Sequence, residues 1–340
     1  MKISTIEHLE TGRFLTRAEA SALMDELLDG RLETPQIVRF LAAMNSRPVR
    51  AEELTGFAQA MRKRATPVFL ADEPRPQNMV DTCGTGGDGS GTFNISTAAA
   101  LVASAAGARV AKHGNRAATS RVGSADVLEA LGVRIDLPFA DYGRAIREIS
   151  IGFFFAQAAH TAARHAAAAR KQIGVRTVFN LLGPLTNPAG AQSQVLGVPS
   201  PEVIDVVAAT LAELGVTRAF VVHGAGGMDE ISLAGETLVA EVRKGKISRY
   251  TVTPETFGVK NAPLAALAGG SAQENAEAIR RVLRGEACAA QDVVLINAAA
   301  ALTAAEVAPD FRDGVALARE ALRTGQAHEK LEALVKFTNP

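Results

Sequence analysis

The chain has 340 residues, 47% of them hydrophobic, and its 36 basic residues balance its 36 acidic ones. This composition predicts a folded protein with a large core divided between domains, and the balanced charge argues against a broad surface for nucleic acid. Two cysteines, Cys83 and Cys288, are too few for a disulfide scaffold and follow no metal-binding spacing. We therefore expect a protein of a reducing, cytoplasmic setting.

The amino-terminal region has the pattern of a helical bundle. Apolar residues recur at helical spacing from Thr16 to Ala65, with breaks at Gly30, Pro35 and Pro48. We expect residues 1–70 to form a small all-helical domain. Pro67–Pro76 is rich in proline and is interpreted as a linker, so a second domain is expected over residues 71–340.

The second domain alternates short apolar runs with helical patterns such as Ser124–Leu131 and Ser200–Leu214. Such alternation predicts an α/β domain with a mainly parallel central sheet. An edge hairpin is expected at Thr237–Arg243 and Lys246–Val252, joined by Lys244-Gly245. The other expected strands are Asn78–Asp81, Arg109–Ala111, Val133–Asp136, Gly152–Phe155, Gln194–Val198 and Ala219–Val222.

Two stretches do not follow the alternation. His160–Lys171 is helical and rich in alanine, and the segment LLGPLTNP follows it. We expect helices from about residues 160–190 to join the amino-terminal helical domain. Beyond Gln273 the pattern is helical throughout. The apolar stretch Val293–Val307 is shorter than a membrane span, so we expect a buried helix and no membrane partner.

A glycine-rich segment, GTGGDGSG, follows the expected strand Asn78–Asp81 and precedes a helical pattern over Ser96–Ala106. Bare backbone between a strand and a helix lets N–H groups approach an anion at the positive end of the helix. Ser96 and Thr97 can cap that helix or bind an oxygen ligand. The pattern is neither G-x-G-x-x-G nor a P-loop. A flexible turn with ordinary capping is the alternative.

Two further polar segments follow expected strands. In KHGNRAATSRVGSAD, Lys112 ends a strand and is expected at the same sheet edge as the glycine-rich segment, where its charge can meet a phosphate. In HGAGGMDEIS, Asp229 and Glu230 are hard oxygen ligands of the kind that Mg²⁺ prefers. Solvated surface loops are the alternative for both segments, and His113 alone is more often structural.

Six motifs, GTGGD, NIST, KHGNR, GSADVLEALG, RTVFNLLGPLTNP and GMDE, occur in this order and resemble those of the anthranilate phosphoribosyltransferases. The resemblance covers nearly the whole chain, including LTRAEASALMDELLDGRLE near its start. It implies a fold of the nucleoside phosphorylase/phosphoribosyltransferase type and a homodimer. It also implies the reaction: transfer of the phosphoribosyl group of 5-phosphoribosyl 1-pyrophosphate (PRPP) to the amine of anthranilate in tryptophan biosynthesis. The products are N-(5-phosphoribosyl)anthranilate and pyrophosphate.

The resemblance also implies roles for individual residues. Two Mg²⁺ ions per monomer are implied, one held by Ser96 and Glu230 and the other by Asp229 and Glu230. Gly84, Asn115 and Arg170 would bind anthranilate, and the planar fork of Arg170 matches a carboxylate. The residues implied to bind PRPP are Gly84, Gly87, Asp88, Thr92, Asn94, Ile95, Ser96, Thr97, Lys112, His113, Gly114, Asn115, Arg116, Ala117, Ala118, Thr119, Ser120 and Ser124.

The implied chemistry is a displacement at the ribose. Lys112 and Mg²⁺ are expected to stabilise the charge that develops on the departing pyrophosphate. The aromatic amine is already a usable nucleophile, so positioning matters more than a strong base. No residue is assigned as general base.

One segment departs from the family pattern. The family has F-A-P-x-x-H-P-A-M-R where this chain has FAQAAHTAAR, with Gln157, Thr161 and Ala163 at the changed positions. His160 is retained. The departure leaves the acceptor preference open.

Two other functions stay open. A pyrimidine nucleoside phosphorylase shares the fold but uses free phosphate, so Mg²⁺ dependence and pyrophosphate release would separate the two. Some relatives of the fold bind nucleic acid and lack the activity. The balanced charge and the intact motifs argue against that second possibility.

Overall fold

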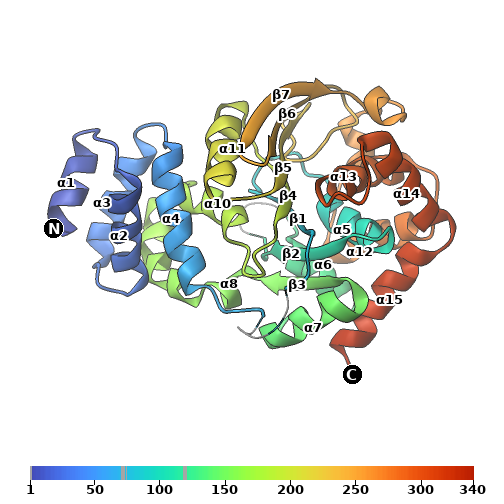
Figure 1. Cartoon of the computed structure of the whole chain (residues 1–340), viewed down its shortest axis with the longest axis horizontal. Coiled ribbons are helices and arrows are strands. Elements are labelled where there is room, and N and C mark those ends of the chain that lie inside the picture. The colour runs from blue at the N-terminus through green and yellow to red at the C-terminus, as the bar shows by residue number, and fades with distance from the viewer. Residues whose placement is uncertain (1, 70–72, 74, 118–120) are drawn as a thin grey trace.

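The computed structural model describes residues 2–69, 73, 75–117 and 121–340. Four helices form the amino-terminal lobe seen on the left of Figure 1: α1 (Lys2–Glu10), α2 (Arg17–Leu28), α3 (Thr34–Asn45) and α4 (Ala51–Arg64). A capping box starts α2, because Thr16 Oγ1 accepts from Glu19 N and Glu19 Oε2 accepts from Thr16 N. Gly56 lets α4 approach α2 closely, since a Cβ there would lie 2.8 Å from the Cβ of Ala20.

The helices expected at about residues 160–190 do pack against this bundle. α8 (Ala156–Ala159), a 3₁₀ turn η1 (Thr161–Ala166), α9 (Ala167–Ile173) and α10 (Val178–Leu182) follow one another, with a further 3₁₀ turn η2 at Pro184–Thr186. α9 packs on α3, and η1 packs on α2. Ala166 and Ala169 are fully buried in the bundle core. Small alanine side chains therefore allow these helices to lie close to the bundle.

The sheet has seven strands in the order β3-β2-β1-β4-β5-β6-β7. The first five strands in that order are parallel, and β6 and β7 form the predicted antiparallel edge hairpin. Lys244 and Gly245 make its turn with positive φ angles of 50° and 78°. The strands are β1 (Met79–Gly84), β2 (Arg109–Gly114), β3 (Ile151–Phe155), β4 (Ser193–Gly197), β5 (Arg218–Gly224), β6 (Thr237–Arg243) and β7 (Lys246–Val252).

The prediction of a strand at Val133–Asp136 is wrong. Val133 and Ile135 are buried while Arg134 and Asp136 are exposed, which is the alternation that a strand also shows. The segment pairs with helices instead of a strand. Arg134 N donates to Thr338 Oγ1 at 3.2 Å, and Arg134 O accepts from the Tyr142 hydroxyl at 3.1 Å.

Helices cover both faces of the sheet (Figure 1). On one face the expected buried helix, α13 (Ala289–Ala304), packs against α5 (Ile95–Ala105) and α14 (Phe311–Arg323) and contacts β1, β4 and β5. On the other face α11 (Ile204–Glu213), preceded by the 3₁₀ turn η3 (Pro201–Val203), contacts β5, β6 and α4. The remaining helical elements are α6 (Ser124–Ala130), α7 (Phe139–Ile149), η4 (Pro254–Phe257), η5 (Leu264–Leu267), α12 (Ala272–Leu283) and α15 (Gln326–Thr338).

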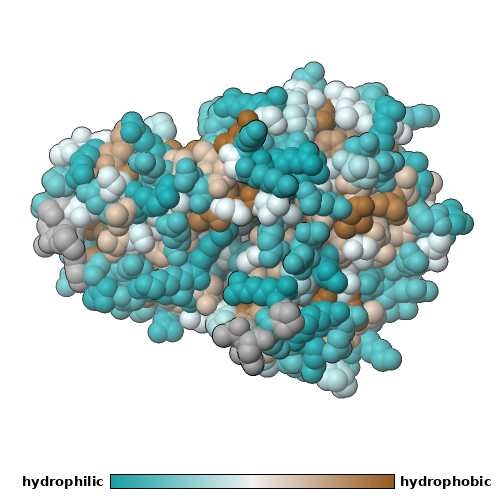
Figure 2. Space-filling view, viewed as in Figure 1, coloured by the Kyte–Doolittle hydropathy of each residue, from teal (hydrophilic) through white to brown (hydrophobic). Residues whose placement is uncertain are grey.

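The helical lobe shares its core with the sheet. One cluster of buried residues joins Phe40 and Phe57 of the bundle to Leu211 of α11 and to Val221 and Val242 of the strands. The two lobes meet at a narrower waist, and most of the face seen in Figure 2 is hydrophilic. Among the described residues no helix combines the length and apolar character needed to cross a bilayer.

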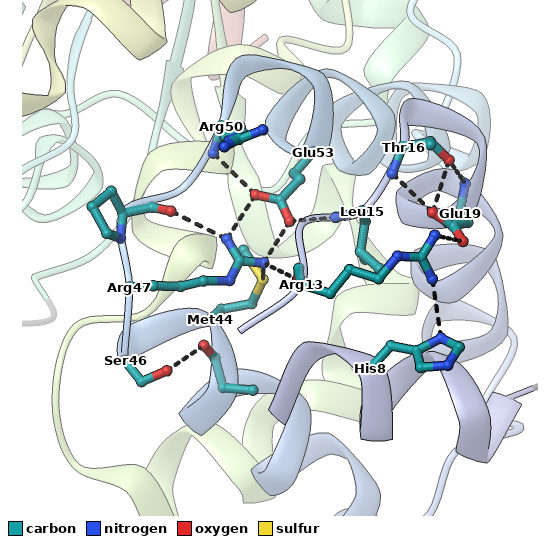
Figure 3. A network of polar contacts seen from close by, with 12 residues as sticks. His8, Arg13, Leu15, Thr16, Glu19, Met44, Ser46, Arg47, Arg50 and Glu53 are labelled. Carbon is teal, nitrogen blue, oxygen red and sulfur yellow. Dashed lines mark hydrogen bonds and ion pairs between the residues drawn. The ribbon is translucent and has the colours of Figure 1, made fainter. Parts of the chain in front are cut away.

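A buried ion pair ties the helical lobe together (Figure 3). The Glu53 carboxylate is inaccessible to solvent and accepts from Arg47 Nη1 at 2.9 Å and Nη2 at 2.5 Å. It also accepts from the backbone N–H groups of Leu15 at 2.9 Å and Arg50 at 3.0 Å. The Arg47 and Arg50 guanidinium groups lie over the Phe14 ring. One carboxylate thus joins the starts of α2 and α4.

We expect Glu53→Ala to lower the free energy of unfolding by about 3–5 kcal/mol, because it leaves the Arg47 charge buried without a partner. Glu52, the preceding residue, is exposed, so Glu52→Ala should change stability by no more than about 0.5 kcal/mol. Urea unfolding of both variants measures the difference. Equal stabilities would show that the ion pair contributes nothing net.

Two buried histidines join β2 to the segment after β3. The rings of His113 and His160 meet edge to face with centroids 5.3 Å apart, and His160 Nε2 lies 3.2 Å from Thr186 Oγ1. Burial lowers the pKa of His113 to about 3, helped by the neighbouring His160, and lowers the pKa of His160 to about 4. Both rings are therefore neutral in the folded protein near neutral pH.

This pair predicts a loss of stability in mild acid. Below the unfolded value of 6.5, the unfolded chain binds protons that the folded protein does not, so each histidine lowers stability by about 1.4 kcal/mol per pH unit. Above that pH the contribution is constant. His113→Gln should reduce the slope of unfolding free energy against pH between pH 6 and 5, whereas His8→Gln, at an exposed histidine, should leave it unchanged. Parallel slopes for wild type and His113→Gln would contradict this expectation.

Candidate active site

The site is built where the chain changes direction across the sheet. The chain runs from β1 outward to β2 and β3 and then returns to β4 on the other side of β1, and ligands of open parallel sheets bind at such a point. The loop after β5 crosses the carboxyl ends of β1 and β4. A Cβ at Gly84 would overlap the Asp229 carboxylate, and one at Gly197 would overlap the Asp229 backbone. Asp229 can therefore lie against the ends of β1 and β4 only because both positions are glycine.

The glycine-rich loop requires glycine for its backbone conformation. Gly86, Gly87, Gly89 and Gly91 have φ angles between 67° and 72°, the left-handed region that other residues rarely adopt. Gly86 N donates to Asp229 Oδ2 at 2.8 Å. The loop leads into α5, and its residues line the cavity described below. The prediction of a glycine-rich turn between a strand and a helix is confirmed.

Three carboxylates and one lysine set the electrostatics. Asp229 N donates to Asp88 Oδ2 at 3.3 Å, and Ser96 N donates to Glu230 Oε1 at 3.1 Å. Burial raises the pKa of Asp229 to about 7 with help from Asp88, and burial together with Asp229 raises the pKa of Glu230 to about 8. Lys112 Nζ donates to the Thr82 carbonyl and lies 3.4 Å from Ser96 Oγ. Burial lowers the pKa of Lys112, while the neighbouring acids favour its charged form.

A further carboxylate, that of Asp81, is fully buried between β1 and β2. Asp81 accepts from His113 N at 3.1 Å and from Asn187 Nδ2 at 2.7 Å. Asn187 also donates to the Ala111 carbonyl at 2.7 Å. Asn187 belongs to the LLGPLTNP segment, so this segment fixes β1 against β2 directly beneath the site.

These elements enclose a cavity of about 640 Å³, termed here the donor cavity. The following residues predicted for PRPP or metal line it: Gly84, Gly87, Asp88, Thr92, Asn94, Ile95, Ser96, Thr97, Lys112, His113, Gly114, Asn115, Ser124, Asp229 and Glu230. The structure does not bring Arg116 or Ala117 into its lining. Arg116 pairs with Asp126 and Glu129 of α6, and Ala117 N donates to Asp126. Ala118, Thr119 and Ser120 lie outside the described residues.

Part of the donor cavity was not predicted. Arg121 and the segment Ala268–Gly270 line it, and so does Asn275. Asn275 Nδ2 donates to Asn94 Oδ1 at 3.1 Å, and Asn275 Oδ1 accepts from Gly270 N at 2.8 Å. The available signal was the glycine pair in GGSAQEN, directly before the capping box that begins α12.

A second cavity of about 650 Å³, termed the acceptor cavity, opens between the helical lobe and the sheet. Arg170 of α9 lines it with His160, Gln157 and Arg164. The Arg170 guanidinium lies 5.3 Å from the centre of the Phe179 ring, which supports it at the wall. The residues that line both cavities are Cys83, Gly84, Thr85, His113, Gly114 and Asn115. The two cavities are therefore neighbours with a common wall.

The changed segment after β3 reaches this wall. Gln157 Nε2 lies 3.4 Å from Asn115 Oδ1, which also accepts from Arg116 N at 2.9 Å. Ala163 and Thr161 line the acceptor cavity as well. All three departures from the family pattern thus fall on the acceptor cavity.

The side chains of the donor cavity suit Mg²⁺ only if a bound polyphosphate supplies further oxygen ligands. Among the described residues, no three His, Cys, Asp or Glu side chains are arranged to hold a metal ion by themselves. Mg²⁺ is commonly bound by one or two carboxylates and by phosphate oxygens. Burial and, after it, repulsion between carboxylates raise the pKa values of Asp229 and Glu230, and a cation there would favour their charged forms. The residues present therefore fit Mg²⁺ that arrives with a polyphosphate.

Comparisons with known proteins agree along the whole chain. The helical bundle domain of the glycosyl transferase family matches residues 3–65, and the a/b domain of that family matches residues 76–328. The anthranilate phosphoribosyltransferase of Pelotomaculum thermopropionicum is 48% identical over 335 residues, covering 98% of this chain and 96% of that protein. The crystal structure of the anthranilate phosphoribosyltransferase of Thermus thermophilus is 47% identical, with a TM-score of 0.92 and full coverage of both chains.

A more distant enzyme has been solved with ligands. The anthranilate phosphoribosyltransferase of Saccharomyces cerevisiae in complex with PRPP and Mg is 27% identical, with a TM-score of 0.88 over 99% of this chain and 97% of that one. With 4-fluoroanthranilate, the yeast enzyme is 25% identical, with a TM-score of 0.87 over 99% and 98% of the two chains. By its full-length identity and its fold, the chain belongs to the anthranilate phosphoribosyltransferases of the glycosyl transferase family.

Proposed function

We propose that the chain performs the reaction of its family across the wall that its two cavities share. PRPP would occupy the donor cavity, and anthranilate the acceptor cavity. The observation that carries this assignment is the common lining by Gly84, Thr85 and Asn115. A group can pass directly between two ligands only where their sites touch. The phosphoribosyl carbon would lie near this wall, with its pyrophosphate towards the glycine-rich loop.

The residues of the donor cavity would act by charge and position. Lys112 is held by the Thr82 carbonyl and directed towards Ser96, so its charge is already in place when the bond from C1 to pyrophosphate breaks. Backbone N–H groups of a glycine-rich loop can bind phosphate oxygens. The amine nitrogen forms the new bond to C1 while pyrophosphate leaves with the bonding pair, and the amine then loses one proton. No residue is assigned to receive it.

Magnesium would be held by the residues named from the resemblance, with Ser96 and Glu230 at one ion and Asp229 and Glu230 at a second. Bound there, it would neutralise charge on the pyrophosphate. The Mg-bound PRPP complex of the yeast enzyme supports its use. The structural support in this chain is the set of partly buried carboxylates beside the glycine-rich loop.

For the acceptor we propose that Arg170 binds the anthranilate carboxylate, with Gly84 and Asn115 beside the ring. The exposed guanidinium on Phe179 keeps its donors available to the cavity. The complex of the yeast enzyme with 4-fluoroanthranilate supports an aromatic acid in this family's site.

We also propose that the chain acts as a homodimer in the cytoplasm. The support is the family resemblance and two cysteines that form no disulfide, Cys83 and Cys288. The nucleoside phosphorylase and nucleic-acid-binding alternatives are not favoured, because every relative described above is an anthranilate phosphoribosyltransferase. An assay for anthranilate consumption with PRPP and Mg²⁺ tests the function directly.

The metal assignment predicts the behaviour of Asp229→Asn combined with Glu230→Gln. The double variant should lose Mg²⁺-dependent turnover, because the amides cannot offset the charge of the ion. Its melting temperature should not fall, since it removes repulsion between partly buried carboxylates. Glu236→Gln, at an exposed carboxylate nearby, is the control and should keep full activity. Turnover by the folded double variant at limiting Mg²⁺ would refute the assignment.

The division of ligands between the cavities predicts opposite effects of two substitutions. Arg170→Ala should weaken anthranilate binding roughly 30- to 150-fold, the loss of about 2–3 kcal/mol from a charge-assisted bidentate contact, and leave PRPP binding nearly unchanged. Lys112→Met should weaken PRPP and spare anthranilate. Calorimetric titration of each folded variant with each ligand separately tests the contrast. Arg164→Ala shows whether the other arginine of the acceptor cavity binds the carboxylate instead; normal anthranilate binding by Arg170→Ala would exclude Arg170.

A further inference from the structure

Arg176 connects the helical lobe to the glycine-rich loop. It lies in the short segment between α9 and α10. Its Nη1 donates to the Gly86 carbonyl at 2.5 Å, and its Nη2 lies 3.4 Å from Thr85 Oγ1. Its own carbonyl accepts from Asn45 Nδ2 at 2.9 Å, and Asn45 is the last residue of α3. One residue therefore contacts the bundle through its backbone and the loop through its side chain.

The loop residue that Arg176 holds is tied on its other side to the carboxylates. Gly86 N donates to Asp229 Oδ2 at 2.8 Å, and Asp229 N donates to Asp88 Oδ2 at 3.3 Å. Gly86 is exposed and has a left-handed φ of 67°. A glycine in that position has much conformational freedom, so the two flanking hydrogen bonds decide where its peptide groups point.

The same segment leads to the acceptor cavity. Arg170 lies on α9, six residues before Arg176, and α9 packs on α3, which carries Asn45. A shift of α9 towards or away from the sheet would move both arginines together. Five residues separate the two arginines: Lys171–Ile173 complete α9, and Gly174 and Val175 lead from its end to Arg176. A short chain segment therefore joins the acceptor contact to the loop contact.

We propose that Arg176 is a positioning residue that couples the occupancy of the acceptor cavity to the conformation of the glycine-rich loop, and so to the affinity of the donor cavity for Mg²⁺-bound pyrophosphate groups. The proposal rests on the assignment of the two cavities made above. It requires that the coupling be reciprocal: each ligand must change the affinity of the other by the same factor.

The test uses magnesium pyrophosphate and anthranilate, because these two ligands do not react with each other. Calorimetry on the full chain gives the dissociation constant of each ligand alone and in the presence of the other. In wild type we expect each ligand to tighten the other severalfold. In Arg176→Gln we expect pyrophosphate alone to bind about tenfold more weakly and the mutual effect to vanish, while anthranilate alone binds within about twofold of wild type. The melting temperature should stay within a few degrees.

Two further variants separate coupling from a merely structural contact. Asn45 lies outside both cavities, and Asn45→Ala removes only the hydrogen bond from the bundle to the Arg176 carbonyl. This variant should keep the pyrophosphate affinity of wild type but reduce the effect of each ligand on the affinity of the other. Lys171→Gln, at an exposed lysine of α9, should behave as wild type. Hydrogen exchange of peptides covering residues 84–91 should be faster in Arg176→Gln.

The possible failures are distinguishable. If wild type binds no magnesium pyrophosphate, the assignment of the donor cavity is wrong. If wild type binds both ligands and Arg176→Gln keeps both the pyrophosphate affinity and the mutual effect, the role of Arg176 is refuted while the proposed function stands.

Discussion

The close approach of Asp229 to the ends of β1 and β4 is the constraint on which the site depends. It is possible only because Gly84 and Gly197 lack a Cβ. The approach places one carboxylate against the glycine-rich loop and the next against the start of α5, through Gly86 N and Ser96 N. Both acids are then crowded and partly removed from water, which raises their pKa values. The structure thus places two carboxylates where a cation that binds with a polyphosphate would offset their negative charge.

The second requirement is that the helical lobe hold its position relative to this charge. The lobe shares a continuous core with one face of the sheet through α4 and α11. The segment that follows β3 passes back into the lobe, so the wall of the acceptor cavity comes from both parts of the chain. Burial of alanines such as Ala166 and Ala169 stabilises this segment with little side-chain volume. Apolar packing therefore sets the distance between the helical lobe and the sheet. Polar contacts set the positions of the side chains that line the cavities.

The sequence predicted most of the fold and many of the residues that line the donor cavity, because both rest on local patterns. Apolar runs followed by glycine or polar loops mark the strand ends that meet at one edge. The misassigned segment Val133–Asp136 shows the limit of the pattern, since alternating burial against α7 and α15 looks like alternating burial in a sheet. Arg116 was expected to bind PRPP, but it pairs with α6 carboxylates. Arg176 and Asn275 were missed because the site residues that they contact, Gly86 and Asn94, lie 90 or more residues away in the sequence.

The two cavities differ in what defines their shape. The donor cavity is defined largely by backbone groups and by charged side chains that hydrogen-bond to the backbone, such as Lys112 and Glu230. A substitution there breaks a network of hydrogen bonds. The wall of the acceptor cavity includes exposed side chains, among them Gln157 and Arg170, and Gln157 also contacts Asn115 of the shared wall. Replacement of such a side chain changes the shape and polarity of the acceptor cavity without disturbing the charges of the donor cavity. Because of this asymmetry, residues such as Gln157, Thr161 and Ala163 can change without altering the motifs that form the donor cavity.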